Sequence, residues 1–197
     1  MDEKDLMDTL KEFMRHFFIL ICLNLLVFSL SAHDLVDLRQ NLPEAVYHCD
    51  KIYVHRHVAS RLKRVQQDLA TLGLGLIVFE GYRPPSEEQF PDENVYSKGT
   101  GIDVSIYYLN DCHLAMPTEY GDDSPRARRD YIEHPAHVFH NCWILEKHMI
   151  KYGFESQIDN WWHFNLKGWD CQEDLNMEYS DLYSPNYCDV VYQKFMP

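Results

Sequence analysis

Three short segments place polar residues among apolar and aromatic neighbours, and these polar residues are the ones whose types could do chemistry. The segments cover residues 80–84, 97–104 and 160–164, with the sequences EGYRP, SKGTGIDV and NWWHF. In the first, Arg83 follows an apolar run and precedes a rigid proline turn, which would hold its planar guanidinium in one direction. Such an arginine either binds a carboxylate or a developing oxyanion, or belongs to a structural salt bridge.

The second and third segments contribute a carboxylate and an imidazole. Asp103 lies in an apolar strand pattern after two glycines, where an unpartnered carboxylate would be costly. His163 is flanked by bulky aromatic residues and is either a hydrogen-bonded core histidine or a functional group. Taken alone, Arg83 and His163 favour the structural interpretation, so only their combination points to a site.

Two helices and several strands are expected to position these segments. Apolar residues at spacings of four and three predict an amphipathic helix over residues 55–72, ended by Gly73. Its apolar positions are Val58, Leu62, Val65, Leu69 and Leu72. The other expected elements are an opening segment at 35–41, strands at 74–80 and 100–109, a hairpin strand at 114–116, a helix at 139–152 with Trp143, Leu145, Met149 and Ile150, and strand and turn at 154–166. This mixture predicts a single α+β domain, a mostly antiparallel sheet with packed helices.

The composition excludes some classes of protein. The 197 residues carry 18 Lys and Arg against 31 Asp and Glu, a formal net charge of −13, and no basic run, which argues against a nucleic-acid partner. A hydrophobic share of 46% and an aromatic share of 14% argue against disorder. A chain of this length needs no metal or disulfide merely to fold.

The N-terminal region has the layout of a secretory signal peptide. Residues 17–30 form a nearly continuous apolar run, followed by small residues up to Ala32, and residues 14–16 supply a short basic start. Because the preceding residues are acidic, translation starting at Met14 is the simplest interpretation. The alternative is an uncleaved membrane anchor, for which the run is short. We therefore expect export to a periplasmic or extracytoplasmic (bacterial) location, with no stable membrane anchor after cleavage.

Export affects how the cysteines are interpreted. Five remain after cleavage, none of them in a C-x-x-C pair: Cys49, Cys112, Cys142, Cys171 and Cys188. In an oxidising compartment some can pair, but an odd number leaves at least one free or bonded elsewhere. Cys142 lies inside a helical pattern and is explained equally well as a small buried apolar side chain.

The order and spacing of these segments resemble the zinc-dependent D-alanyl-D-alanine dipeptidases. The resembling segments are LVDL at 35–38, LGL at 74–76, EGYRP at 80–84, PDEN at 91–94, S-x-G-x-x-x-D at 97–103, MPTE at 116–119, residues 149–154 and WWHF at 161–164. The resemblance covers most of the chain after residue 32. It implies an α+β fold of the D-Ala-D-Ala peptidase (hedgehog/DD-peptidase) type and a small peptide such as cell-wall-derived D-Ala-D-Ala as substrate.

The resemblance also implies a set of site residues, and the chain departs from it at two positions. In that family a His, an Asp and a second His bind zinc, a Glu is the general base, and the GYRP arginine stabilises the transition state. Asp103 and His163 match two of the zinc ligands, and Arg83 matches the arginine. Tyr96 stands where the first His is expected, and Asn160 stands where the Glu is expected.

Both departures affect chemistry. Tyr96 would ligate zinc only as a phenolate, from an ordinary pKa of about 10. Asn160 cannot accept a proton, and loss of a general base costs about 10² to 10⁴ in rate. The neighbouring Asp159 would substitute only if a turn or bulge redirected it, because a one-residue shift in a strand reverses the side chain. The substrate contacts expected from the resemblance are Tyr82, Ser97, Trp161 and Trp162.

The predicted organisation is a signal peptide or extension at 1–32, a dipeptidase-like domain at 33–169 and an acidic, tyrosine-rich tail at 170–197. The first functional hypothesis is a zinc dipeptidase acting on D-Ala-D-Ala with impaired activity. The second is a catalytically inactive homologue that keeps the pocket as a peptide-binding or regulatory module. A decayed sequence without a selected function is the third.

Overall fold

The computed structural model describes residues 14–17, 34–87, 95–110, 114–169, 174–175, 177–178 and 182. The chain divides into two units, Met1–Asp34 and Leu35–Pro197. In the first unit the described residues 14–17 are helical, and the rest of the predicted signal peptide lies outside the described residues. Within the described part of the chain, no helix has the length and apolar character needed to cross a membrane.

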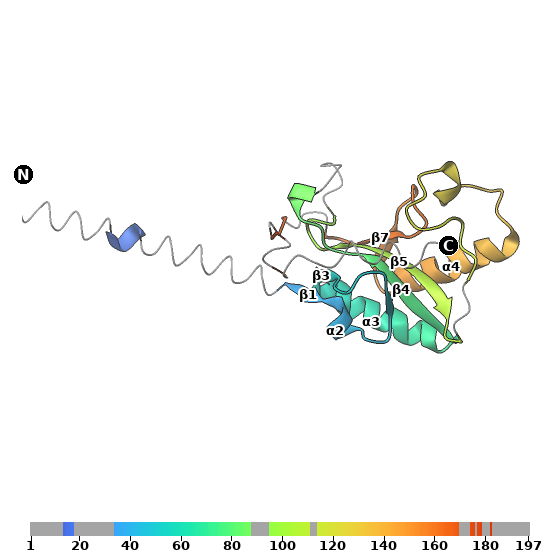
Figure 1. Ribbon diagram of the computed structural model, residues 1–197, viewed down its shortest axis with the longest axis horizontal. Helices are drawn as coiled ribbons and strands as arrows, with labels where there is room; N and C mark the ends of the chain where they lie inside the picture. The colour runs from blue at the N-terminus through green and yellow to red at the C-terminus, as the bar shows by residue number, and fades with distance from the viewer. Residues whose placement is uncertain are drawn as a thin grey trace, which may run out of the picture. The chain divides into compact units, whose positions relative to one another are not determined.

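The second unit is built on a five-stranded sheet in which three of the four neighbouring pairs are antiparallel. Its strand order is β2 (Val46–Tyr47), β4 (Leu74–Glu80), β5 (Gly101–Tyr108), β7 (His163–Leu166) and β6 (Phe154–Ser156). Figure 1 labels the central strands β4, β5 and β7. Only β2 and β4 run parallel. A separate antiparallel pair joins β1 (Leu35–Asp37) to β3 (Tyr53–His55).

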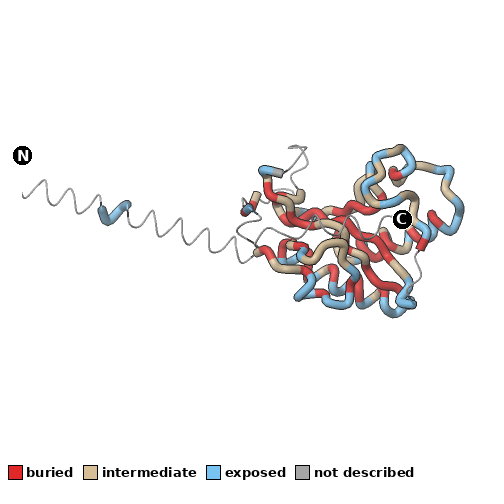
Figure 2. Tube along the Cα trace, in the orientation of Figure 1, coloured by how far each residue is buried: buried red, intermediate tan, exposed pale blue. Residues whose placement is uncertain are grey.

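The helices cover the sheet and complete the α+β fold that the sequence predicts. They are α2 (Leu38–Asn41), α3 (Arg56–Ala70) and α4 (Ala136–Lys151), with short 3-10 turns η1 (Pro85–Glu87) and η3 (Pro125–Ala127). Helix α3 contacts β4, α4 contacts β6, and the two helices contact each other. The buried positions follow the central strands and the inner helix faces (Figure 2). Trp161, Phe154 and Phe164 are the largest of the fully buried side chains.

Helix α3 confirms the amphipathic pattern. Val58, Leu62, Val65 and Leu69 are fully buried. The inclusion of Leu72 was wrong: the helix ends at Ala70, and Leu72 is 54% exposed in the turn that follows. Gly73 closes this turn with a φ of 74°, a conformation that glycine adopts without steric cost.

The remaining elements match the predictions with two corrections. Strand β4 has the predicted bounds, and β6 and β7 supply the expected strands at 154–166. Residues 114–116 form no strand; instead Asn141 of α4 donates a hydrogen bond to the carbonyl of Ala115 (2.9 Å). Helix α4 starts three residues earlier than predicted, and its Trp143 and Ile150 are each 52% exposed because only one face packs inward.

Candidate functional site

Strand register brings three ionisable side chains together across the three central strands of the sheet, where β4 ends and β7 begins. Asp103 of β5 lies opposite His163 of β7, and on its other side it lies opposite Glu80 of β4. Directly opposed residues in antiparallel strands have Cβ atoms about 4.5–5.5 Å apart, so their side chains interact. The pairing shifts between Val78 and Glu80, so the extra residue Phe79 is bulged and Glu80 comes level with Asp103.

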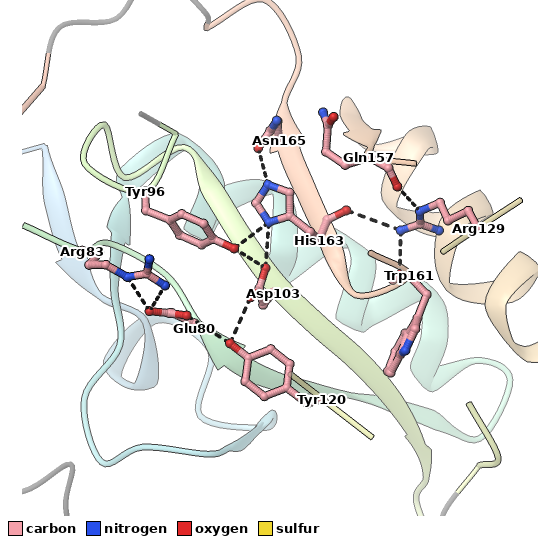
Figure 3. Close-up of polar contacts among 10 residues, drawn as sticks. All are labelled: Glu80, Arg83, Tyr96, Asp103, Tyr120, Arg129, Gln157, Trp161, His163 and Asn165. Atoms are coloured by element: carbon pink, nitrogen blue, oxygen red, sulfur yellow. Dashed lines mark hydrogen bonds and ion pairs between the residues drawn. The ribbon is translucent and has the colours of Figure 1, made fainter. Parts of the chain in front are cut away.

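Asp103 is the centre of the resulting network (Figure 3). It is only 2% exposed. Its Oδ1 accepts hydrogen bonds from the Tyr96 hydroxyl (2.7 Å) and from Nδ1 of His163 (2.7 Å), and its Oδ2 accepts one from the Tyr120 hydroxyl (3.0 Å). These three bonds offset the cost of burying a carboxylate.

His163 is held through both ring nitrogens. Its Nδ1 lies 2.7 Å from Asp103 and 2.8 Å from the Tyr96 hydroxyl. Its Nε2 lies 2.9 Å from Oδ1 of Asn165, which shares the same face of β7 because strand side chains alternate. The ring orientation is therefore fixed by protein groups.

Tyr96 lies in the turn that leads into β5. Its carbonyl accepts the amide of Gly99 (2.8 Å), and Gly99 has a φ of 67°. Burial raises the pKa of the Tyr96 phenol well above its ordinary range, and the negative charge of Asp103 raises this pKa further. Tyr96 is therefore a protonated hydrogen-bond donor.

Arg83 adds a cation at the edge of the network. Its Nε and Nη2 donate to the same carboxylate oxygen of Glu80 (3.0 and 2.7 Å), and its guanidinium lies 4.7 Å from the centre of the Tyr96 ring. The Arg83 side chain is 25% exposed. The second Glu80 oxygen lies 3.0 Å from the Tyr120 hydroxyl, whose single proton is shared between Glu80 and Asp103. We call this network the sheet cluster, and its members are Glu80, Arg83, Tyr96, Asp103, Tyr120, His163 and Asn165.

The residues at the predicted metal position do not fit a three-ligand zinc centre. Tetrahedral ligand atoms bonded to zinc at about 2.0–2.1 Å lie roughly 3.3 Å apart. The polar atoms of Tyr96, Asp103 and His163 instead lie 2.7–2.8 Å apart, which is hydrogen-bond spacing. Within the described residues, no group of three or more His, Cys, Asp or Glu side chains is placed to hold a metal ion.

Asn160 and Asp159 precede the aromatic segment and lie in an irregular stretch between β6 and β7. Asp159 is 64% exposed and forms an ion pair with Arg128. Arg128 also binds Asp130 (2.9 Å), and we call these three residues the surface cluster. The structure thus places Asp159 in a solvent-exposed ion pair, not among the hydrogen bonds of the sheet cluster.

Trp161 and Trp162 are both buried and pack edge to face. Trp162 also packs against the Tyr120 ring of the sheet cluster. Trp161 donates its indole N–H to Thr118 and lines a cavity of about 270 Å³ beside α4. Arg129 lies in the same cavity wall, and it donates to the carbonyls of residues 157 and 161 (Figure 3). Trp162 therefore borders the sheet cluster, whereas Trp161 borders the cavity beside α4.

Cys142 also lines that cavity. Burial raises the pKa of its thiol to about 12, so the thiol stays protonated at neutral pH. The sequence predicted a small buried apolar side chain, and the structure places Cys142 as a free thiol of intermediate burial.

Tyr82 and Ser97, the other predicted substrate contacts, bind the C-terminal part of the chain. The Tyr82 hydroxyl donates to the carbonyl of Met177 (2.6 Å), and the Ser97 hydroxyl donates to Asp174 (2.7 Å). Both side chains are buried. Each is the sequence neighbour of one member of the sheet cluster, since Tyr82 precedes Arg83 and Ser97 follows Tyr96.

Sequence reasoning did not assign a site role to Glu80, Tyr120 or Asn165. Two of the three left a usable signal. Glu80 stands three residues before Arg83, and Asn165 stands two residues after His163, so it shares a strand face. Tyr120 left no such signal, because it reaches Asp103 from an irregular segment.

Comparison with known proteins agrees with the predicted resemblance. No family model matches the chain. The chain is 24% identical over 161 residues to the D-alanyl-D-alanine dipeptidase of Enterococcus faecalis, covering 61% of this chain and 76% of that protein. It is 25% identical over 154 residues to that of Streptomyces coelicolor (61% and 76%), and 23% identical over 137 residues to that of Escherichia coli (62% and 71%). These distant similarities support the D-alanyl-D-alanine dipeptidase family and a peptidase-like function.

Proposed function

We propose that the protein is a divergent member of the D-alanyl-D-alanine dipeptidase family that binds small peptides such as D-Ala-D-Ala and hydrolyses them poorly or not at all. The observation that carries the proposal is the position of the Tyr96 hydroxyl, within hydrogen-bond distance of both Asp103 and His163. A phenol in this position satisfies the two groups that would otherwise be zinc ligands.

The pKa of Tyr96 supports this proposal. A metal would have to displace the phenol proton, and burial beside Asp103 makes the phenolate still less favourable than in water. Zinc binding through Asp103 and His163 would also require the ligand atoms to move apart from their present 2.7 Å.

The position of the expected general base supports the same conclusion. Asn160 cannot take a proton from water, and the nearby carboxylate of Asp159 is bound to Arg128. A hydrolase without a general base loses about 10² to 10⁴ in rate. The two substitutions together remove both the third ligand and the proton acceptor.

Peptide binding depends on the groups that remain. Arg83 presents a partly exposed guanidinium held by Glu80, and a peptide carboxylate is a suitable partner for its planar fork. Trp162 and Tyr120 provide an aromatic wall beside the network. We further propose that the chain is exported through its N-terminal segment and meets such peptides outside the cytoplasm.

The second candidate function is a zinc-dependent dipeptidase that turns over its peptide substrate. The observation in its favour is that Asp103 and His163 lie on adjacent strands and that Arg83 joins the same network through Glu80. In this case Tyr96 would move away from the pair on zinc binding.

Calorimetry and a hydrolysis assay with D-Ala-D-Ala test the two candidates, with zinc supplied throughout. We expect the natural chain to bind the peptide with little turnover. The Tyr96→His/Asn160→Glu variant should hydrolyse at least about 10²-fold faster. Asp159→Asn in that variant is the matched control and should leave its rate unchanged. Turnover by the natural chain at the rate of the double variant would favour the second candidate, and failure to bind the peptide would refute the first.

A further inference from the structure

The C-terminal part of the chain is bound to the two turns that carry Arg83 and Tyr96. Its described residues in this region are Asp174, Leu175, Met177 and Glu178, which we call the C-terminal strap. Its residues Asp174 and Met177 contact Ser97 and Tyr82, each of which is adjacent in sequence to a member of the sheet cluster, and Glu178 accepts a hydrogen bond from Ser86 (2.8 Å).

The first attachment point is Tyr82. The Tyr82 hydroxyl donates to the carbonyl of Met177 (2.6 Å) and accepts the amide of the same residue (2.9 Å). Tyr82 is only 3% exposed. One buried hydroxyl thus satisfies both backbone groups of Met177, an arrangement that fixes the position of the strap against this turn.

The second attachment point is Ser97, which is fully buried. Its hydroxyl donates to Oδ1 of Asp174 (2.7 Å), and its carbonyl accepts the amide of Leu175 (2.9 Å). A bond to a carboxylate is the stronger kind of hydrogen bond, since the acceptor is charged. Ser97 is therefore held through both its side chain and its backbone.

Apolar packing reinforces both points. Leu175 and Met177 form a small cluster with Leu35 and Tyr82, separate from the main core. Gly99 allows this approach, because a Cβ added there would lie 2.9 Å from Leu35 and 3.4 Å from Leu175. Leu175 and Met177 of the strap therefore bury their side chains in an apolar cluster that they share with Leu35 and Tyr82.

Tyr82 and Ser97 stand at the two ends of the segment that carries two of the cluster residues, Arg83 and Tyr96. Arg83 follows Tyr82 directly, and Tyr96 precedes Ser97 directly. The two turns are also joined to each other, since the Arg83 amide donates to the Tyr96 carbonyl (3.3 Å) and the Arg83 guanidinium covers the Tyr96 ring. A strap bound at both ends restrains the positions of Arg83 and Tyr96 together.

We propose that the C-terminal strap is a positioning element of the peptide site, with Tyr82 and Ser97 as the positioning residues through which it holds Arg83 and Tyr96. The proposal rests on the proposed function only in assigning Arg83 and Tyr96 to a peptide site. Release of the strap loosens the two turns and weakens peptide binding, without unfolding the sheet.

Hydrogen exchange on the full chain tests this proposal. The variant Tyr82→Phe/Asp174→Ala removes the hydroxyl and carboxylate bonds to the strap and keeps the Tyr82 ring. We expect exchange of the Arg83 and Gly99 amides, both of which donate to the Tyr96 carbonyl, to accelerate at least ten-fold, while α3 amides are unchanged. Affinity for D-Ala-D-Ala should fall several-fold in the same variant.

Tyr53→Phe is the matched control, because it removes a tyrosine hydroxyl bound to the carbonyl of Leu182, further along the tail. It should leave the Arg83 and Gly99 amides unchanged. Asp174→Asn keeps a side-chain oxygen for Ser97 and should restore most of the protection that Asp174→Ala loses. If amide exchange in α3 also accelerates in the double variant, the single variant Asp174→Ala is measured instead, with the same expected results for the Arg83, Gly99 and α3 amides.

Unchanged Arg83 and Gly99 amides in a variant whose Leu175 and Met177 amides exchange faster would overturn the proposal. Equal exchange rates of the Arg83 and Gly99 amides in Asp174→Asn and Asp174→Ala would also contradict the proposal. Because the exchange measurement uses no peptide, failure of the natural chain to bind D-Ala-D-Ala would refute the proposed function and leave the strap result standing.

Discussion

The sheet cluster and the surface cluster both combine arginine with carboxylates, but they differ in what holds them in place. In the sheet cluster, strand register sets Glu80 and His163 on either side of Asp103, and Asp103 is almost fully buried. In the surface cluster, Arg128 reaches Asp130 and Asp159 from irregular segments in solvent. Exposed ion pairs contribute little to stability, whereas buried polar groups depend on their partners. The side chains of the sheet cluster should therefore be interdependent, and those of the surface cluster should not.

The largest expected difference between the clusters comes from removing one carboxylate from each. Asp103→Ala removes the acceptor that two hydroxyls and an imidazole share in a buried site, and it leaves Tyr120 bound to Glu80 and Tyr96 bound to His163, so we expect a loss of about 1–3 kcal/mol. The matched substitution Asp130→Ala leaves Arg128 to water and to Asp159. Urea unfolding of both variants measures the contrast. Equal losses of unfolding free energy in the two variants would contradict the claim that the sheet cluster depends on its partners more than the surface cluster does.

Removal of one hydroxyl from the sheet cluster should have a smaller effect. Tyr96→Phe deletes the hydroxyl that donates to Asp103 and lies 2.8 Å from Nδ1 of His163, and it keeps the ring beneath Arg83. We expect the unfolding free energy to fall by about 0.5–1.5 kcal/mol, the net contribution of one hydrogen bond. A stability equal to that of the natural chain would show that the hydroxyl contacts contribute nothing.

Alkaline pH should weaken the folded state through the same hydroxyls. The pKa values of Tyr96 and Tyr120 are raised in the folded chain by burial and by the nearby carboxylates. Above pH of about 10 the unfolded tyrosines lose protons that the folded ones keep, so the free energy of unfolding decreases as pH rises. Unfolding curves between pH 8 and 11 should show this decrease, and Tyr96→Phe should make it shallower. An identical slope in the variant would contradict the burial of the phenol.

The smallest effect is expected for Asp159→Asn. This change removes one exposed partner of Arg128, which keeps Asp130. We expect no resolved change in the urea midpoint at 0.15 M salt, because ions screen exposed charges at that concentration. A loss as large as that of Asp103→Ala would show that the surface cluster is structurally important.

The periodicity of the chain predicted the elements that carry the site, but only part of the site itself. Helix α3, strand β4 and the β6–β7 hairpin follow from local patterns of apolar residues and glycine. Asp103 and His163 were recognisable because polar residues interrupt apolar strands. Their direct opposition depends on strand register, which the sequence does not state.

The rest of the site depends on tertiary contacts. The bulge at Phe79 decides that Glu80 faces Asp103, and Tyr120 reaches the same carboxylate from a segment without periodicity. The contacts of Tyr82 and Ser97 lie about 80 to 95 residues away in sequence, since they join Met177 and Asp174. Local patterns carry no information about such distant partners.

The zinc content of the full chain tests the central claim most directly. Elemental analysis after dialysis against zinc and then against zinc-free buffer would compare the natural chain with Tyr96→His. The account predicts no retained zinc in the natural chain, because the Tyr96 phenol satisfies Asp103 and His163, and one zinc per chain in Tyr96→His, which supplies a third ligand. One zinc per natural chain, lost in His163→Ala, would contradict it.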